Sequence, residues 1–166
     1  MSSQKSRVHA HEMQYLELAA RQLFSVIFII ASAGHFSQGT IASAAQHGVP
    51  MAGLLVPASG LTALMGGLSL LFGYRAKMGA WLLVLFLVPV TLTMHNFWTV
   101  SDPVISQMHQ AMFGRNILML SGALLIAYFG AGPLSLDAFI AEPVLELDCV
   151  ASNVLAAQSP MRTTAI

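Results

Sequence analysis

The chain has 166 residues, of which 56% are hydrophobic and 8% charged, whereas a soluble domain carries about 25% charged residues. This composition excludes an ordinary soluble domain, and a net charge of zero without any basic run excludes a nucleic-acid partner. The one cysteine, Cys149, excludes an internal disulfide and a CxxC dithiol, so a redox role would need a bound cofactor, a quinone or another subunit.

Charged residues are missing from three long stretches of the chain. Each stretch is long enough to cross a bilayer, because a spanning helix needs about 20 apolar residues. The stretches lie between Arg21 and Arg75, between Lys77 and Asp102, and between Arg115 and Asp137. The first is interrupted by glycines and a proline and therefore holds two spans. The sequence predicts an all-α, polytopic membrane protein with a four-transmembrane-helix bundle, whose first partner is the lipid bilayer.

The N-terminal part combines a polar segment with the first span. We expect residues 1–20 to form a cytoplasmic or interfacial segment, either a helix along the membrane surface or a frayed tail. The first span covers about residues 22–38. Its residues Ala31, Ser32 and Ala33 also resemble a signal-peptide cleavage site, so removal of this span is an alternative.

The second span follows a predicted loop over residues 35–50 and covers about residues 51–72. Small side chains recur at every fourth position of this span, at Ser59, Ala63 and Gly67. Such a ridge lets the backbone of another helix approach closely. We therefore expect a helix to pack on it.

The third and fourth spans complete the bundle domain of residues 21–133. The third covers about residues 78–98, and Pro89 should kink it. Residues 99–114 are predicted to form an outer loop with room for a short helix, and the fourth span covers about residues 115–129. Residues 134–166 are then a cytoplasmic C-terminal tail.

The basic residues predict the orientation. Arg115 falls on one side of the four-span arrangement, and the other basic residues fall on the opposite side, namely Lys5, Arg7, Arg21, Arg75, Lys77 and Arg162. The positive-inside rule then places both termini in the cytoplasm. The expected location is the cell (inner) membrane, as a multi-pass protein.

Six motifs occur in an order and spacing that resemble one membrane-protein family, namely ASAGHF, HGVP, GGLSLLFGYRAKMGA, TLTMHNFW, FGRN and GAGPLSLD. Over about residues 20–137 they resemble the DoxX family of small four-helix integral membrane proteins. That family is similar to the small subunit of a thiosulfate:quinone oxidoreductase, and other members are implicated in quinone or catechol stress. The resemblance implies a small membrane component linked to quinone or redox processes. Many relatives carry Glu where this chain has Ala63, which counts against an acid–base role of the second span, and Lys where it has Arg115.

The candidate site lies where three spans meet the outer membrane face. The first span ends near His35, the third ends near His95, and the fourth begins near Arg115, with Asn96, Trp98 and Asn116 as supporting residues. A quinone carbonyl could accept a hydrogen bond from Arg115 or His95 and stack on the neighbouring aromatic rings. Arg21, Ser25, Ser32 and His35 share one helix face, which either bonds to neighbouring helices or lines this site.

Other functions remain open from the sequence, including whether the protein is an enzyme. It could be a non-catalytic accessory or assembly subunit that contacts other membrane redox subunits or a second copy of itself. Alternatively, His35 and His95, together with either His109 or Met108, could bind copper, zinc or haem iron, although no HxxxH pair is present. Transport of a small solute is a further alternative, but the spans contain no carboxylate that could serve as a proton relay.

Overall fold

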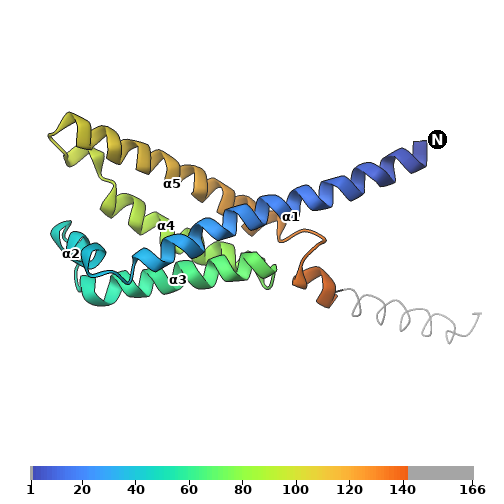
Figure 1. Cartoon of the computed structure of the whole chain (residues 1–166), viewed down its shortest axis with the longest axis horizontal. Helices are drawn as coiled ribbons and strands as arrows, with labels where there is room; N and C mark the ends of the chain where they lie inside the picture. Colours follow the sequence, from blue (N-terminus) through green and yellow to red (C-terminus); the bar gives the residue numbers. More distant parts are fainter. Residues whose placement is uncertain (1, 142–166) are drawn as a thin grey trace, which may run out of the picture.

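The computed structural model describes residues 2–141, with side chains from Glu12 onward. Over this range the chain is all-helical, as predicted. In chain order the elements are α1 (Ser2–Gly34), α2 (Gln38–Gln46), α3 (Ala52–Phe72), α4 (Ala76–Met94), the 3-10 helix η1 (Phe97–Thr99) and α5 (Pro103–Phe129) (Figure 1). Cys149 and most of the predicted tail lie outside the described residues.

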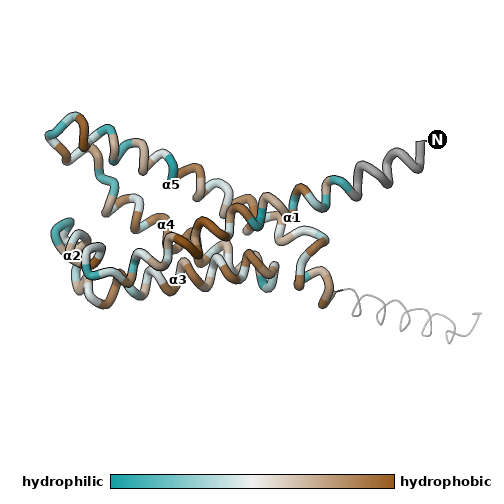
Figure 2. Tube along the Cα trace, in the orientation of Figure 1, coloured by the Kyte–Doolittle hydropathy of each residue, from teal (hydrophilic) through white to brown (hydrophobic). Residues whose placement is uncertain are grey.

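Four of these helices are long and apolar enough to cross a membrane. The candidate spans are Glu12–Gly34, Ala52–Phe72, Ala76–Thr99 and Pro103–Phe129. Apolar residues follow the four long helices where they pack together (Figure 2). The prediction of a multi-pass protein with four spanning helices is confirmed.

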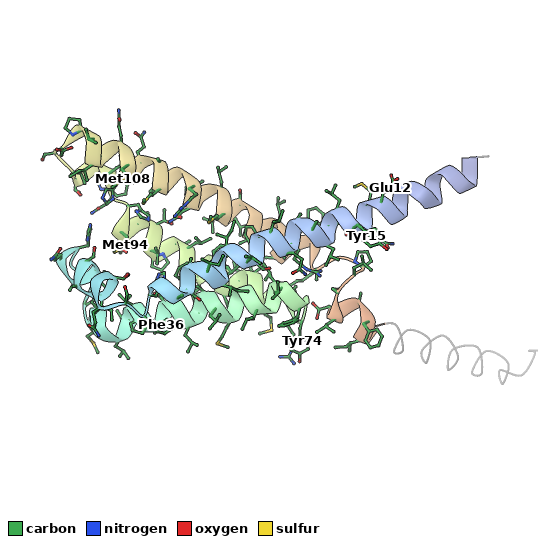
Figure 3. The ribbon with its side chains drawn as sticks, viewed as in Figure 1. Glu12, Tyr15, Phe36, Tyr74, Met94 and Met108 are labelled. Carbon is green, nitrogen blue, oxygen red and sulfur yellow. The ribbon has the colours of Figure 1, made fainter. Side chains whose placement is uncertain are left out.

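Helix α1 is continuous across the predicted boundary at residues 20 and 21. Its 33 residues make a rod of about 50 Å, and its N-terminal part projects beyond the other helices, where Figure 3 labels Glu12 and Tyr15. The possible cleavage site lies inside the helix, where Ser32 is 2% exposed.

The predicted loop over residues 35–50 contains the helix α2. Ser37 caps the N-terminus of this helix, because its side-chain oxygen accepts a hydrogen bond from Thr40 N at 3.2 Å. Ala44 is buried against Ala52 and Val56 of α3. With nine residues, α2 is about 14 Å long, too short to span a bilayer, and it lies across one end of the bundle, which we call the α2 end (Figure 1).

Helix α5 begins twelve residues before the predicted start at Arg115. Asp102 Oδ1 accepts hydrogen bonds from Val104 N and Ile105 N at 2.8 and 3.0 Å, and Pro103 occupies the first helical turn. The prediction of an outer loop over residues 99–114 was therefore wrong except at its first residues. Arg115 lies within the helix, about 18 Å from its start.

The small-residue ridge of α3 packs against α1. A Cβ atom on Gly67 would lie 3.0 Å from Ile29 Cγ1, and one on Gly60 would lie 2.6 Å from His35 Cβ. Ala63 is fully buried between them. Of the predicted ridge of Ser59, Ala63 and Gly67, Ala63 is buried and Gly67 makes the expected close approach, whereas Ser59 is only half-buried. Gly60 adds a second close approach, so α1 and α3 pack tightly.

At the opposite end of the bundle, the segment after α5 folds back onto two other helices. The Arg21 guanidinium donates to the backbone oxygens of Ala131 and Leu134, the latter at 2.7 Å. The Asp137 carboxylate accepts from the backbone N–H groups of Arg75 and Ala76 at 2.7 and 2.9 Å. A carboxylate at a helix N-terminus is stabilised by the helix dipole, so Asp137 anchors this segment to the start of α4.

Candidate functional site

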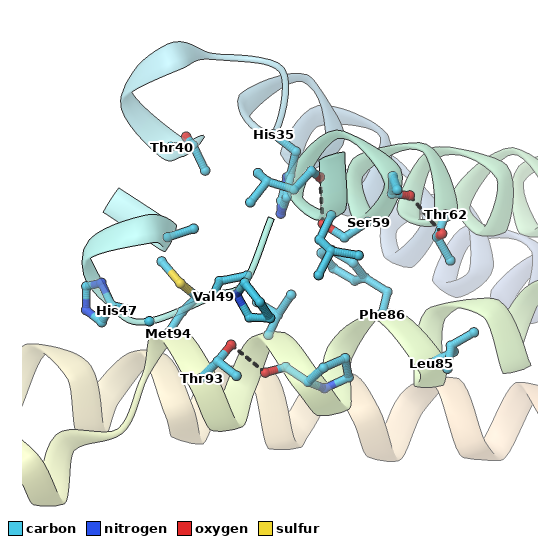
Figure 4. Close-up of a pocket in the computed structure, with 18 residues that line it drawn as sticks. His35, Thr40, His47, Val49, Ser59, Thr62, Leu85, Phe86, Thr93 and Met94 are labelled. Atoms are coloured by element: carbon cyan, nitrogen blue, oxygen red, sulfur yellow. Dashed lines mark hydrogen bonds between the residues drawn. The ribbon is translucent and has the colours of Figure 1, made fainter. Parts of the chain in front are cut away.

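The α2 end contains a cavity of about 480 Å³. It is lined by the end of α1, by α2, by the first half of α3 and by the second half of α4 (Figure 4), and it is open to one side. Its walls are mainly apolar, from side chains such as Val56, Phe86, Val90 and Met94. A second cavity, of about 610 Å³, lies between α1 and α5 at the other end, but the guanidinium of Arg21 that borders it already donates to two backbone oxygens.

Local sequence features shape this cavity. Pro89 has no N–H, so the carbonyl of Leu85 lacks its usual partner one turn later in α4. Both residues line the cavity. On the other side, α2 ends before Gly48, whose φ of +78° suits glycine, and the following Val49 and Pro50 return the chain to α3 along the cavity wall.

The polar side chains of the cavity are few, and most direct their hydrogens away from it. The hydroxyls of Ser59, Thr62 and Thr93 donate to backbone oxygens of their own helices, at 2.7, 2.9 and 2.7 Å (Figure 4). His35 Nδ1 lies 3.0 Å from Ala31 O. The His35 ring meets the ring of Phe86 edge to face, with centroids 5.2 Å apart, so the two rings form one wall.

Three histidines meet at the edge of the cavity. The ring of His109 lies 6.2 Å from that of His47 and 5.9 Å from that of His95, measured between centroids. His109 Nδ1 is 3.1 Å from Met94 O, and Met94 and His47 also line the cavity. His95 Nδ1 is buried without a hydrogen-bond partner. Within residues 12–141, no group of three or more His, Cys, Asp or Glu side chains is arranged to hold a metal ion.

The residues of the predicted site lie in separate places in the structure. His35 lines the cavity. His95 belongs to the histidine cluster, and Arg115 is exposed on α5. Trp98 packs edge to face on Phe113, with centroids 6.0 Å apart.

The two asparagines of the predicted site are separated as well. Asn96 precedes η1 as its N-cap residue, and Asn116 is 5% exposed inside the bundle. Met108, the alternative metal ligand, lies on α5 at the same end of the bundle as Met94 (Figure 3).

The polar face of α1 is turned toward the bundle interior, as predicted. Arg21, Ser25 and Ser32 are 5%, 0% and 2% exposed. The serine hydroxyls donate to the backbone oxygens of Gln22 and Ile29 at 2.9 and 2.7 Å. They therefore support the helix itself, and of the four residues in this face His35 is the one that lines the α2-end cavity.

Sequence reasoning missed Phe86, Thr93 and the role of His47. Thr93 and Phe86 are ordinary residues of an apolar span, and no pattern distinguishes the side that faces a cavity from the side that faces lipid. His47 stands in one of the six family motifs, which was a usable signal. Its contact with His109 depends on α2, which was predicted to be a loop.

Comparison with known proteins identifies the domain that forms this cavity. A family model described as DoxX matches residues 16–96, a range that contains every residue lining the cavity, from His35 to Met94. No curated protein and no solved structure matches the chain. The match supports the resemblance over the first three motifs and most of the fourth, while FGRN and GAGPLSLD lie beyond it, and residues 16–96 of this membrane protein with four candidate spans form a DoxX-family domain.

Proposed function

We propose that this DoxX protein binds a small, flat, largely apolar molecule of the quinone type in the α2-end cavity, as a small membrane component linked to quinone or redox processes. The cavity itself carries the proposal. Its volume of about 480 Å³ is in the range of about 300–1,000 Å³ typical of small-molecule sites. It also has their usual chemistry, apolar walls with a few placed polar groups.

The walls suit a ring compound. His35 and Phe86 present a continuous aromatic edge, and aromatic rings pair favourably in edge-to-face or offset arrangements. Val56 and Val90 supply branched apolar surface on α3 and α4. A flat ring would contact both kinds of wall, while a substituent could reach Thr93 near the histidine cluster.

A second candidate site is the one that the sequence predicted around His95 and Arg115. Its specific support is the buried His95 Nδ1, which lacks a partner, and Arg115 of α5 would supply a cationic donor for a carbonyl. Such a site would lie next to the cavity and share the histidine cluster with it. We further propose that the α2 end faces the outer side of the cell (inner) membrane, because Arg75 and Lys77 lie at the other end of the bundle.

The test is binding of decylubiquinone and of its reduced form, decylubiquinol, to the purified full chain in lipid nanodiscs, by equilibrium dialysis. Ala58 lines the cavity, and Ala45 does not; both are exposed alanines on helices of the α2 end. Ala58→Phe should fill the cavity and weaken saturable binding at least tenfold, while Ala45→Phe should bind as the unchanged protein does. The absence of saturable binding by the unchanged protein, or equal binding by both variants, would contradict the proposal.

A further inference from the structure

We infer that the α2-end cavity selects a neutral hydrogen-bond donor, so that it binds a phenol or dihydroxybenzene in preference to the corresponding quinone or ether. The inference rests on the proposed function, that a ring compound occupies this cavity. It follows from the direction of the hydrogen bonds that the lining groups already make.

Three hydroxyl groups of the lining already donate their hydrogens to the backbone. Ser59, Thr62 and Thr93 each donate to a backbone oxygen three or four residues earlier, at distances of 2.7–2.9 Å. A hydroxyl has one hydrogen and two lone pairs. Each of these oxygens can therefore accept a hydrogen bond from a ligand but has no second hydrogen to offer.

The two histidines of the lining also have one ring hydrogen engaged by a backbone oxygen. His35 Nδ1 lies 3.0 Å from Ala31 O, and His47 Nδ1 lies 2.8 Å from Ser43 O. A carbonyl oxygen only accepts, so in each ring Nδ1 must carry the hydrogen. In a neutral imidazole the other nitrogen, Nε2, is then an acceptor. Each ring, when neutral, therefore has an acceptor at Nε2 and no free donor.

The backbone of the lining also adds acceptors and no donors. Pro89 leaves the carbonyl of Leu85 without its usual helix partner. The N–H groups of Gly48 and Val49 are engaged by carbonyls of α2, at 3.0 and 3.1 Å. Thr40 shares a hydrogen bond of 2.8 Å with Ser37, in which either hydroxyl can be the donor, so its contribution is tested separately below.

A charged donor does not fit. The lining residues of this cavity include no Asp or Glu, and an unpaired ammonium group in an apolar site is strongly disfavoured. A neutral O–H on a flat ring meets both conditions, because it donates without charge and its ring packs against His35 and Phe86. A quinone carbonyl would instead face the lone pairs of other acceptors and gain no hydrogen bond from these lining groups.

The experiment compares two pairs of probes that differ in the donor. The probes are 4-hexylphenol with 4-hexylanisole, in which a methyl group replaces the hydroxyl hydrogen, and decylubiquinol with decylubiquinone. Binding is measured on the full chain in nanodiscs, and only the part lost in Ala58→Phe is counted, because the compounds partition differently into lipid. We expect the phenol and the quinol to bind at least about tenfold more tightly than their partners, a difference of about 1.4 kcal/mol.

Lining variants identify the acceptors. Thr93→Val and Ser59→Ala should each reduce the preference for the phenol over the ether, whereas Thr40→Val should leave it unchanged. Ser121→Ala is the matched control. Ser121 lies on α5, outside the lining of the cavity, and its hydroxyl donates to Leu118 O of its own helix at 2.7 Å. Ether or quinone binding as tight as that of the donor would overturn this inference and leave the proposed function standing. No saturable binding of any probe would overturn both.

Discussion

The contact between α1 and α3 should respond sharply to the smallest possible change, Gly60→Ala. The added Cβ atom would lie 2.6 Å from His35 Cβ and 3.2 Å from Ser32 O, whereas two carbon atoms settle at about 3.5–4.0 Å. The helices must therefore separate by about 1 Å, because the atoms in the way are close to the backbone of α1. Overpacking of this kind costs about 1–3 kcal/mol.

The control for this change is Gly114→Ala. Gly114 also lies within a helix, α5, but an added Cβ there would meet nothing within 4 Å. Both changes gain up to about 1 kcal/mol of helix propensity, so the difference between the variants isolates the packing term. We expect Gly60→Ala to be less stable than Gly114→Ala by about 1–3 kcal/mol, measured by unfolding in mixed detergent micelles as a function of the SDS mole fraction and followed by circular dichroism. Equal stability of the two variants would refute the close helix pair.

Three further predictions address the opposite end, the orientation and the second candidate site. Asp137→Ala removes the carboxylate that caps α4 and should lower stability by about 0.5–2 kcal/mol in the same micelle assay. Asp137→Asn keeps one acceptor and should lower stability by less. Unchanged stability in both variants would show that Asp137 does not anchor the segment. Cysteines introduced at Ser43 or Ser101 should react with an impermeant maleimide added outside intact cells, and the native cysteine should not; the reverse pattern would invert the orientation. His95→Gln and Arg115→Met should leave folding intact and weaken decylubiquinone binding if the second site is used, whereas unchanged binding would assign the ligand to the cavity alone.

The sequence predicted the middle of the bundle closely. The expected spans over residues 51–72 and 78–98 correspond to α3 and α4, because their ends are marked by strong local signals. Gly73 adopts a left-handed conformation with φ of +64°, which favours glycine and ends α3. Hydrophobic length and such breaks are properties of short segments, so they can be read without knowing the fold.

The cavity could not be predicted in the same way. It depends on α2, whose start is fixed by one hydrogen bond from Thr40 N to Ser37, in a stretch with no charged residue and little periodicity. The sequence identified His35 from its place at the end of the first span. Phe86 and Thr93 face the cavity only because α4 packs between α3 and α5, and that arrangement comes from long-range contacts that no local pattern carries.

Arg115 shows how a single cap changes a functional hypothesis. Placing the start of the span at Arg115 put this residue at the depth of His35 and His95, but the cap at Asp102 makes it an interior residue of α5. His109 marks the level of Met94, and Arg115 lies six residues further along, about 9 Å deeper. A charge at the centre of a membrane helix costs about 2.5–3.5 kcal/mol, less when a long side chain reaches back to the boundary. Since α5 has 27 residues, its length of about 40 Å exceeds a hydrocarbon core of about 30 Å by about two turns. If the excess lies at the α2 end, as the proposed orientation requires, the histidine cluster lies at the membrane boundary, and a ligand that enters from that side meets it first.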